Sequence, residues 1–237
     1  MTTNQLVVVT YNIDQREYNL VERMNTFVAL IKETMPDVLL IQEATRLSLE
    51  KLVRSLALLG YKKFIPENKN LRPTTEAIFS KIPMKECEFL DFKGSISGLS
   101  CATLDIWGTE PILICTSQFG SHPTQKRNNV VDLAYFTKSE PNVIFGGDTN
   151  ILEYQKDITK PEGWLDAWYE GGTDKEKYSV DFNTNPFVSP PNKDRPDRVW
   201  YKGNLICKEC KFFGNTSDVT ISSHFGILTV FEILPNL

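Results

Sequence analysis

Short runs of apolar residues alternate with segments in which apolar residues recur every three or four positions. The runs at 6–9 and 38–41 have the length of buried strands. The segment between them is spaced like one face of a helix, and so is the segment from Leu49 to Leu59. The first helical stripe consists of Val21, Met24, Phe27, Val28 and Ile31. We predict further strands at 77–80, 102–107, 112–115, 143–145, 198–200 and 226–232, and a third helix near 126–138.

Local signals mark the ends of these elements. Asn19 and Glu22 are spaced as a capping box before the first helix. Pro36 is expected to end that helix, and Gly60 to end the second one. The segment 181–196 is rich in Pro and Asn and predicts a long loop, and loops of that length are often functional.

The order of elements begins strand–helix–strand–helix and then becomes rich in strands. This order favours a layered α/β fold with mixed sheets over a purely parallel sheet. The sequence has no internal repeat and no segment typical of an interdomain linker, and 41% of its 237 residues are hydrophobic. We therefore expect a single domain over residues 1–237.

The composition argues against several classes of protein. A formal net charge of −4 gives no global basic field for DNA or an anionic membrane, so nucleic-acid contacts would need a local basic patch or a metal. Five cysteines spread along the chain do not resemble a disulfide framework, which favours an intracellular location, the nucleus or the cytoplasm. No apolar run approaches a membrane span, and we expect no membrane partner.

Polar residues follow the predicted strands at the points where the strands end. The strand at 143–145 leads to Asp148 and Asn150 through two glycines, which we expect to turn the backbone tightly. Other polar groups in corresponding places are Asn12, Gln42, Glu43, Gln118, Asp197 and His224. Because apolar strands pack into a common core, polar groups at matching ends could converge on one rim and form an active site.

The chemistry of this set favours a hard cation and a phosphoester. Carboxylate and amide oxygens, with few histidines and no clustered cysteines, favour Mg²⁺ first and Mn²⁺ second. A cation beside a histidine and a carboxylate that can activate water suits phosphoester hydrolysis.

Five motifs resemble those of the endonuclease/exonuclease/phosphatase superfamily, the DNase I-like metal-dependent phosphoesterases. They are Thr-Tyr-Asn at 10–12, Gln-Glu at 42–43, Gly-Asp-Thr-Asn at 147–150, Asp-Arg-Val at 197–199 and Ser-His at 223–224. Three further features are similar to the tyrosyl-DNA phosphodiesterase branch of that superfamily. These are the Thr in Gly-Asp-Thr-Asn, the Thr-Ser-x-x-x-Ser at 116–121, and Glu-Arg-Met at 22–24 before Pro-Asp-Val at 36–38.

This resemblance implies a four-layer α/β sandwich, in which two mixed β-sheets pack face to face and helices lie on the outside. It implies that Glu43 binds Mg²⁺ with support from Asn12. It makes Asp148 the residue that activates water, and Asn150 the residue that holds the phosphate or the water. The implied activity is a phosphodiesterase acting on DNA ends, with 5′-phosphotyrosyl adducts as candidate substrates.

The resemblance also makes His224 the group that contacts a phosphate oxygen, and Asp197 the residue that orients it. A carboxylate beside a histidine fixes the tautomer and raises the pKa of the ring. A metal and a partly protonated histidine would stabilise the charge that develops on oxygen in the transition state. We assign further substrate contacts to Asn150, Gln118 and Ser223.

The chain departs from the family pattern at several positions. Ser223 stands where the family has an aspartate before the last histidine, which removes a carboxylate from the surroundings of the cation. Gln118 replaces a histidine and can carry no charge, and His122 is a candidate to substitute for it. Leu152 and Val180 replace an arginine and a tryptophan of the tyrosyl-DNA branch. These two changes weaken the case for phosphotyrosyl specificity more than the case for the chemistry.

Each motif also has a plain structural interpretation. Gly-Gly-Asp-Thr-Asn consists of ordinary turn formers, and Glu43 could be a helix N-terminal charge favoured by the dipole. His224 could be a buried histidine with a satisfied hydrogen bond. Asp197 and Arg198 could form a surface ion pair of little energetic value.

Three aromatic residues, Trp164, Trp168 and Tyr169, could stack on bases. Their spacing is helical, however, so we expect them to pack in the core.

Two other functions stay open. One is the same chemistry on another phosphoester, as in an abasic-site or single-strand nuclease, an RNA deadenylase, or an inositol or lipid phosphatase. The other is a catalytically weakened binding module, which Ser223 and Gln118 motivate.

Overall fold

The computed structural model describes residues 5–67, 72–95, 97–106, 108–173, 177–216 and 218–235. The helices are α1 (Leu20–Thr34), α2 (Arg46–Leu58), α3 (Pro123–Phe136) and α4 (Ala167–Gly171). The strands of the first half are β1 (Gln5–Asn12), β2 (Val38–Ala44), β3 (Lys62–Phe64), β4 (Thr75–Ser80), β5 (Met84–Asp91), β6 (Gly98–Leu104) and β7 (Ile112–Gln118). Those of the second half are β8 (Val143–Asp148), β9 (Leu165–Asp166), β10 (Val180–Asp181), β11 (Lys193–Asp194), β12 (Asp197–Lys202), β13 (Leu205–Phe213) and β14 (Gly226–Ile233).

Two six-stranded sheets form the centre of the molecule. The first has the strand order β13-β14-β1-β2-β4-β3, and the second has the order β5-β6-β7-β8-β12-β9. In each sheet one central pair is parallel, β1 with β2 and β7 with β8, and the other pairs are antiparallel. Both sheets are therefore mixed, as the order of elements in the sequence predicted.

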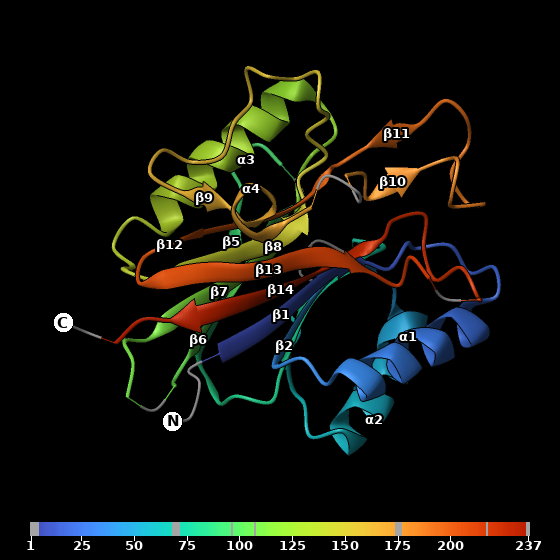
Figure 1. Ribbon diagram of the computed structural model, residues 1–237, viewed down its shortest axis with the longest axis horizontal. Helices are drawn as coiled ribbons and strands as arrows, with labels where there is room; N and C mark the ends of the chain where they lie inside the picture. Colours follow the sequence, from blue (N-terminus) through green and yellow to red (C-terminus); the bar gives the residue numbers. More distant parts are fainter. Residues whose placement is uncertain are drawn as a thin grey trace.

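The sheets and helices form four layers. Helices α1 and α2 cover the outer face of the first sheet, and α3 covers the outer face of the second (Figure 1). Between the sheets lies an apolar core built from side chains of both, including Leu6, Val8, Leu40, Ile114 and Ile144, each fully buried. The predicted four-layer sandwich is confirmed.

The structure corrects several local predictions. Asn19 adopts a left-handed conformation with φ 49°, and its side chain makes no capping hydrogen bond, so the capping-box interpretation is wrong. The two glycines before Asp148 lie inside β8 and form no turn. The segment 181–196 includes parts of the small hairpin β10–β11. The predicted strand at 102–107 ends at Leu104, and position 107 lies outside the described residues.

Two long strands, β5 and β13, are absent from the sequence prediction. Both are edge strands with several exposed residues, so neither shows a continuous apolar run. In β13 a bulge after Cys207 places Cys207 and Cys210 both among buried residues, which disturbs the alternation of strand positions. Within the described ranges, no helix is both long enough and apolar enough to cross a bilayer.

Candidate active site

The site lies at one end of the gap between the two sheets. In β1 the side chains that face the gap are Leu6, Val8, Thr10 and Asn12, which change from apolar to polar along the strand. The same change runs along β7, from Ile112 and Ile114 through Thr116 to Gln118. Because strand side chains alternate between faces, a single register brings these polar ends together.

A buried glutamine joins the two sheets directly beneath the site. The Nε2 atom of Gln42 donates hydrogen bonds to the hydroxyls of Thr10, 3.0 Å away, and Thr116, 2.7 Å away. Opposite it, Gly146 allows the sheets to approach closely, since a Cβ there would lie 2.7 Å from Leu40 and 3.0 Å from Thr10. Glycine at position 146 therefore allows the two sheets to lie close together, and it is not needed for a turn.

Glu43 reaches the site through an irregularity in β2. Alternation would place Glu43 on the helix-covered face, with Ile41. Its backbone is instead left-handed, with φ 54°, and the register between β2 and β4 shifts between Ile41 and Ala44. Left-handed backbone in a residue other than glycine costs of order 1 kcal/mol, and such strain clusters at functional sites. Asn150, also with φ 54°, shares this conformation.

Two amide side chains hold the carboxylates together. Asn12 Nδ2 donates to Glu43 Oε1 at 3.1 Å and to Asp148 Oδ2 at 3.0 Å. Gln118 Nε2 donates to Glu43 Oε1 at 2.6 Å and, more weakly, to Asp148 Oδ2 at 3.5 Å. The oxygen of Asn12 accepts the backbone N–H of Asp14, so Asn12 positions Glu43 and Asp148 rather than presenting a free oxygen.

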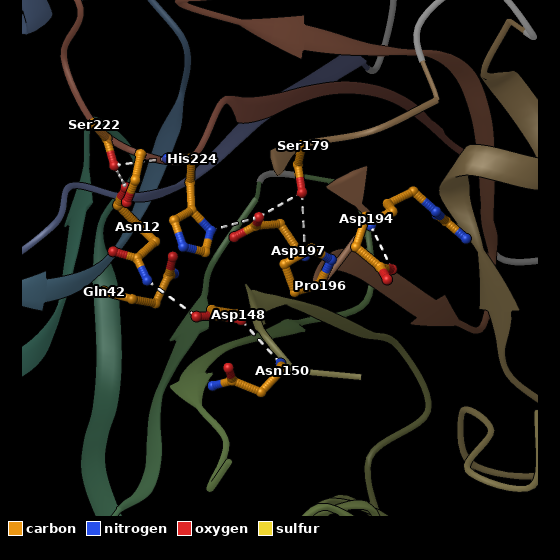
Figure 2. A network of polar contacts seen from close by, with 12 residues as sticks. Asn12, Gln42, Asp148, Asn150, Ser179, Asp194, Pro196, Asp197, Ser222 and His224 are labelled. Atoms are coloured by element: carbon orange, nitrogen blue, oxygen red, sulfur yellow. Dashed lines mark hydrogen bonds and ion pairs between the residues drawn. The ribbon is translucent and has the colours of Figure 1, made fainter. Parts of the chain in front are cut away.

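Asp148 ends β8 and is almost fully buried. Its Oδ1 accepts the backbone N–H of Asn150 at 2.9 Å, and its Oδ2 accepts the amide of Asn12 (Figure 2). The same Oδ2 also accepts the amide of Gln118. Burial raises the pKa of Asp148 to about 6; His224 opposes this rise, and the charges of Asp197 and Glu43 add to it. Asp148 is thus charged at neutral pH yet basic enough to take a proton.

His224 and Asp197 form a buried ion pair. Asp197 Oδ2 lies 2.9 Å from Nδ1 of His224 and also accepts the hydroxyl of Ser179 at 2.6 Å (Figure 2). Burial alone would lower the pKa of His224, but Asp197, with help from Asp148 and Glu43, raises it to about 10. The ring is therefore protonated at neutral pH, and Nε2–H is the donor that it can offer to a ligand.

Asp14 contacts Ser223, the residue that stands in place of the aspartate of the family pattern. Ser223 Oγ donates to Asp14 Oδ2 at 2.6 Å, and the Ser223 backbone N–H donates to the same oxygen at 3.3 Å. Although burial opposes it, hydrogen bonds from Ser223 and Arg16 keep the pKa of Asp14 below its ordinary value. Asp14, 209 positions earlier in the chain, therefore brings a carboxylate into contact with Ser223, and this carboxylate is also paired with Arg16 at 2.8 Å.

The predicted site residues come together, although their contacts differ in part from the prediction. Gln118 and Ser223 contact carboxylates of the site, and Asn150 Nδ2 donates to the carbonyl of Phe119. His122 does not replace the missing histidine, because it caps α3, where its Nδ1 accepts the N–H of Thr124. Asp197 lies in a buried pair, so the surface ion-pair interpretation is wrong.

Sequence reasoning assigned no role to Arg23, a residue that supports the rim. Arg23, fully buried on α1, donates hydrogen bonds to the backbone carbonyls of Arg16, Ile13, Asp14 and Ile221. It therefore ties the loop that carries Asp14 to the loop that carries Ser222 and His224. In the sequence this residue appeared as part of the Glu-Arg-Met motif at 22–24 and as a charged residue in an otherwise apolar helical face.

The donor atoms suit a hard cation on the Glu43 side of the site. Donors of Asp148, Asp197 and His224 lie within 4.8 Å of one another, but a protonated ring bound to Asp197 is a poor metal ligand. Glu43 and Asp148 instead share two amide donors, Asn12 Nδ2 and Gln118 Nε2, so their carboxylates lie close together. A position between two carboxylates favours positive charge and offers oxygen ligands only, which fits Mg²⁺ or Mn²⁺.

The sequence profile of the Endonuclease/Exonuclease/phosphatase family matches residues 9–224. The chain belongs to this family. The match begins in β1 and ends at His224, so the five endonuclease/exonuclease/phosphatase motifs lie within it.

Relatives of this endonuclease/exonuclease/phosphatase chain lie in the branch that the motifs indicated. This chain is 27% identical over 214 residues to the 5′-tyrosyl-DNA phosphodiesterase of Caenorhabditis briggsae. The aligned region covers 84% of this chain and 60% of that protein. The chain thus spans about 60% of the length of that relative.

Solved structures agree on the fold. Truncated Caenorhabditis elegans TDP2 superposes with a TM-score of 0.83 at 22% identity, over 96% of this chain and 98% of that one. D. rerio TDP2 complexed with single strand DNA product gives a TM-score of 0.84 at 21% identity, over 96% and 99% of the two chains. At such identities the likeness establishes the architecture.

Proposed function

We propose that this chain is a divalent-metal-dependent phosphodiesterase that hydrolyses phosphodiester bonds at DNA ends, with 5′-phosphotyrosyl adducts as the favoured substrates. The observation that carries this proposal is the convergence of Glu43, Asp148, Asp197 and His224 on one rim, where Asp148 is ionised and His224 is protonated at neutral pH. Similarity to a 5′-tyrosyl-DNA phosphodiesterase favours the DNA-end substrate. We further propose that residues 1–237 form one catalytic domain that acts in the nucleus or the cytoplasm.

Asp148 is the proposed general base. It is ionised above a pKa of about 6, and Asn12, Gln118 and the N–H of Asn150 hold its two oxygens in place. A water placed beside the carboxylate would pass its proton to Asp148 as it attacks phosphorus. The role of Asn150 is to hold the attacking water or a phosphate oxygen.

His224 is the proposed contact to the phosphate. Asp197 holds Nδ1, which directs Nε2–H away from the pair, and the raised pKa of His224 keeps that proton in place at neutral pH. A fixed positive donor at a developing oxyanion stabilises the transition state more than the ground state. Gln118 and Ser223 are assigned to the edge of the substrate site.

Glu43 is the proposed ligand of Mg²⁺, with Mn²⁺ as a substitute and Asn12 as support. When bound, the cation would supply Lewis-acid stabilisation of negative phosphate oxygens. Asp14 contributes a further carboxylate beside Ser223, although its Oδ2 is also paired with Arg16.

A panel of substrates separates this proposal from its alternatives. The purified chain is incubated with Mg²⁺ and with each of four substrates: 5′-phosphotyrosyl DNA, abasic duplex, poly(A) RNA and inositol phosphates. The control variant is Asp91→Asn, which changes an exposed residue of β5. Turnover of the first substrate alone supports the proposal. Turnover only of another member indicates the same chemistry on a different phosphoester, and tight binding without any turnover indicates a binding module.

A further inference from the structure

A second charged hollow lies on the other face of the second sheet. Asp197 faces the gap between the sheets, and the next residue of β12, Arg198, faces outward on the same side as Trp200. There a cavity of about 420 Å³ is bounded by β12, the segment 151–160 and α4, and its charged lining is Glu153, Lys156, Lys160, Asp166, Arg195 and Arg198. This volume falls within the range of about 300–1,000 Å³ typical of small-molecule sites. In Figure 1, α4 and β9 lie beside β12 at this place.

Two buried guanidinium groups line the cavity, and one buried carboxylate serves only the first of them. Arg195 is 2% exposed and Arg198 is 7% exposed. Asp166 accepts both terminal nitrogens of Arg195, at 3.2 and 3.3 Å, together with the indole N–H of Trp200 at 3.3 Å and the backbone N–H of Trp168 at 3.0 Å. The two oxygens of Asp166 therefore already accept four hydrogen bonds, and none of these comes from Arg198.

Donors of both arginines stay unsatisfied among the described residues. Neither Nε of Arg195 nor Nη1 of Arg198 has a hydrogen-bond partner there. Nη2 of Arg198 reaches only the carbonyl of Ile151, at 3.4 Å. Buried donors without partners cost free energy, because they have lost water and gained nothing in exchange. Burial and the neighbouring Arg195 accordingly lower the pKa of Arg198 to about 10.

Glu153 lies near both arginines but makes no hydrogen bond to either of them. Its Oε1 lies 3.5 Å from Nε of Arg195 and 3.6 Å from Nη2 of Arg198, which is beyond ordinary hydrogen-bond length. The side chain is 30% exposed and also faces Lys177 at 3.5 Å. With Lys156 and Lys160 counted, four positive groups face two negative ones in a chain whose net charge is −4.

We infer that this cavity is an anion site that takes a phosphate group, and that Glu153 occupies the entrance as a weak internal substitute. A phosphate presents several acceptor oxygens, which match the planar donors of two arginines better than a single carboxylate at 3.5 Å does. The site lies on the opposite face of the sheet from the catalytic rim and does not depend on the reaction proposed there.

Tyr169 bears on the source of the phosphate. It was predicted to pack in the core with Trp164 and Trp168, which are indeed buried, but Tyr169 is 73% exposed at the edge of the cavity. Its ring centroid lies 5.2 Å from Cζ of Arg195, so the guanidinium already lies against the ring. A nucleotide could place its phosphate on the arginines and its base on Tyr169, whereas free phosphate would not use the ring.

The test is a gain of binding. Wild type, Glu153→Gln and Glu162→Gln are titrated with inorganic phosphate; Glu162 is exposed and lies outside the cavity, so its substitution makes the same charge change elsewhere. Binding is followed by calorimetry and by the NMR signal of the Trp200 indole N–H, which lies in this cavity. Removing the competing carboxylate should tighten binding about tenfold in Glu153→Gln and leave Glu162→Gln like wild type.

Two further comparisons locate the site and its ligand. Binding should persist in His224→Ala, which removes the phosphate contact of the catalytic rim, and should weaken at least tenfold in Arg198→Lys, a variant that keeps the charge. A deoxynucleoside monophosphate that binds more tightly than phosphate, with the gain lost in Tyr169→Ala, identifies a nucleotide source; equal affinities identify free phosphate. Equal affinities of Glu153→Gln and Glu162→Gln, or an indole signal of Trp200 that does not move, would overturn the proposal.

Discussion

Asp197→Asn tests the origin of the charge on His224. Asparagine has nearly the shape of aspartate and can still accept the hydroxyl of Ser179, so the change removes a charge with little change in packing. The pKa of His224 is raised from 6.5 to about 10, and the attraction of Asp197 is the largest of the contributions that raise it. At about 1.36 kcal/mol per unit of pKa, this rise represents about 5 kcal/mol in favour of the protonated ring.

Two carboxylates remain in the variant. Asp148 and Glu43 still raise the pKa of His224, whereas burial lowers it. We therefore expect the pKa to fall from about 10 to about 7 in Asp197→Asn. Hydrolysis that requires protonated His224 would then decline above about pH 7, rather than above about pH 10, because the donor to the phosphate is lost.

The same change alters stability in a pH-dependent way. A pKa that is higher in the folded state stabilises the fold fully below the unfolded pKa of about 6.5, and this stabilisation disappears as the pH rises to about 10. Asp197→Asn should therefore lower the free energy of unfolding by about 4 kcal/mol at pH 6, which is most of the 5 kcal/mol, and by much less near pH 10.

Histidine NMR gives the direct measurement, since the chain has only two histidines. His122, exposed at the start of α3, serves as the internal control whose signals should be the same in both proteins. Denaturant titrations at pH 6 and pH 9.5 measure the stability difference. A wild-type His224 that titrates near 6.5, or a variant that still titrates near 10, would refute the assignment of its charge to Asp197.

Four further outcomes are expected. Asp148→Asn should lower turnover roughly 10²-fold and abolish the decline in rate below about pH 6, and an unchanged rate constant would exclude Asp148 as the base. Glu43→Gln should raise the Mg²⁺ concentration needed for half-maximal rate at least tenfold, measured by metal titration; equal titration curves contradict its role as ligand. Arg23→Met removes the hydrogen bonds of the guanidinium to five backbone carbonyls, so urea denaturation should show a loss of about 3 kcal/mol or more, and a loss below 1 kcal/mol would show that water replaces the guanidinium. Ser223→Asp should lower the melting temperature by bringing two carboxylates together, while Asp14→Asn in the same chain should restore it; no rescue would mean that repulsion is not the cause.

The sequence was sufficient for the architecture and for the convergence of the rim. Polar residues at the ends and starts of buried strands indicated that Asn12, Asp148 and His224 could converge, because the strands share a core. The contribution of Asp14 could not be derived in the same way. Its contact with Ser223 depends on two loops whose relative position is set by Arg23, and no local pattern encodes that distance.

Edge strands and backbone irregularities limited the rest. Strands β5 and β13 have exposed faces and lack the apolar runs that identify strands in a sequence. Strand alternation would place Glu43 on the wrong face, and only the left-handed residue and the shifted register explain how it reaches the site. Tyr169 follows a helical spacing into α4, but this helix has only five residues, too few to bury a continuous face.

The residues of the rim are divided between the two sheets. Asn12 and Glu43 are carried by one sheet, whereas Gln118, Asp148 and Asp197 are carried by the other, so no single element fixes the catalytic distances. If one sheet shifted against the other by about an ångström, the hydrogen bond between Asn12 and Asp148 would lengthen although every strand stayed intact. Apolar side chains between the sheets, such as those of Ile114 and Ile144, therefore set the distance between the two parts of the rim. Trimming them should slow turnover at temperatures where the chain is still folded.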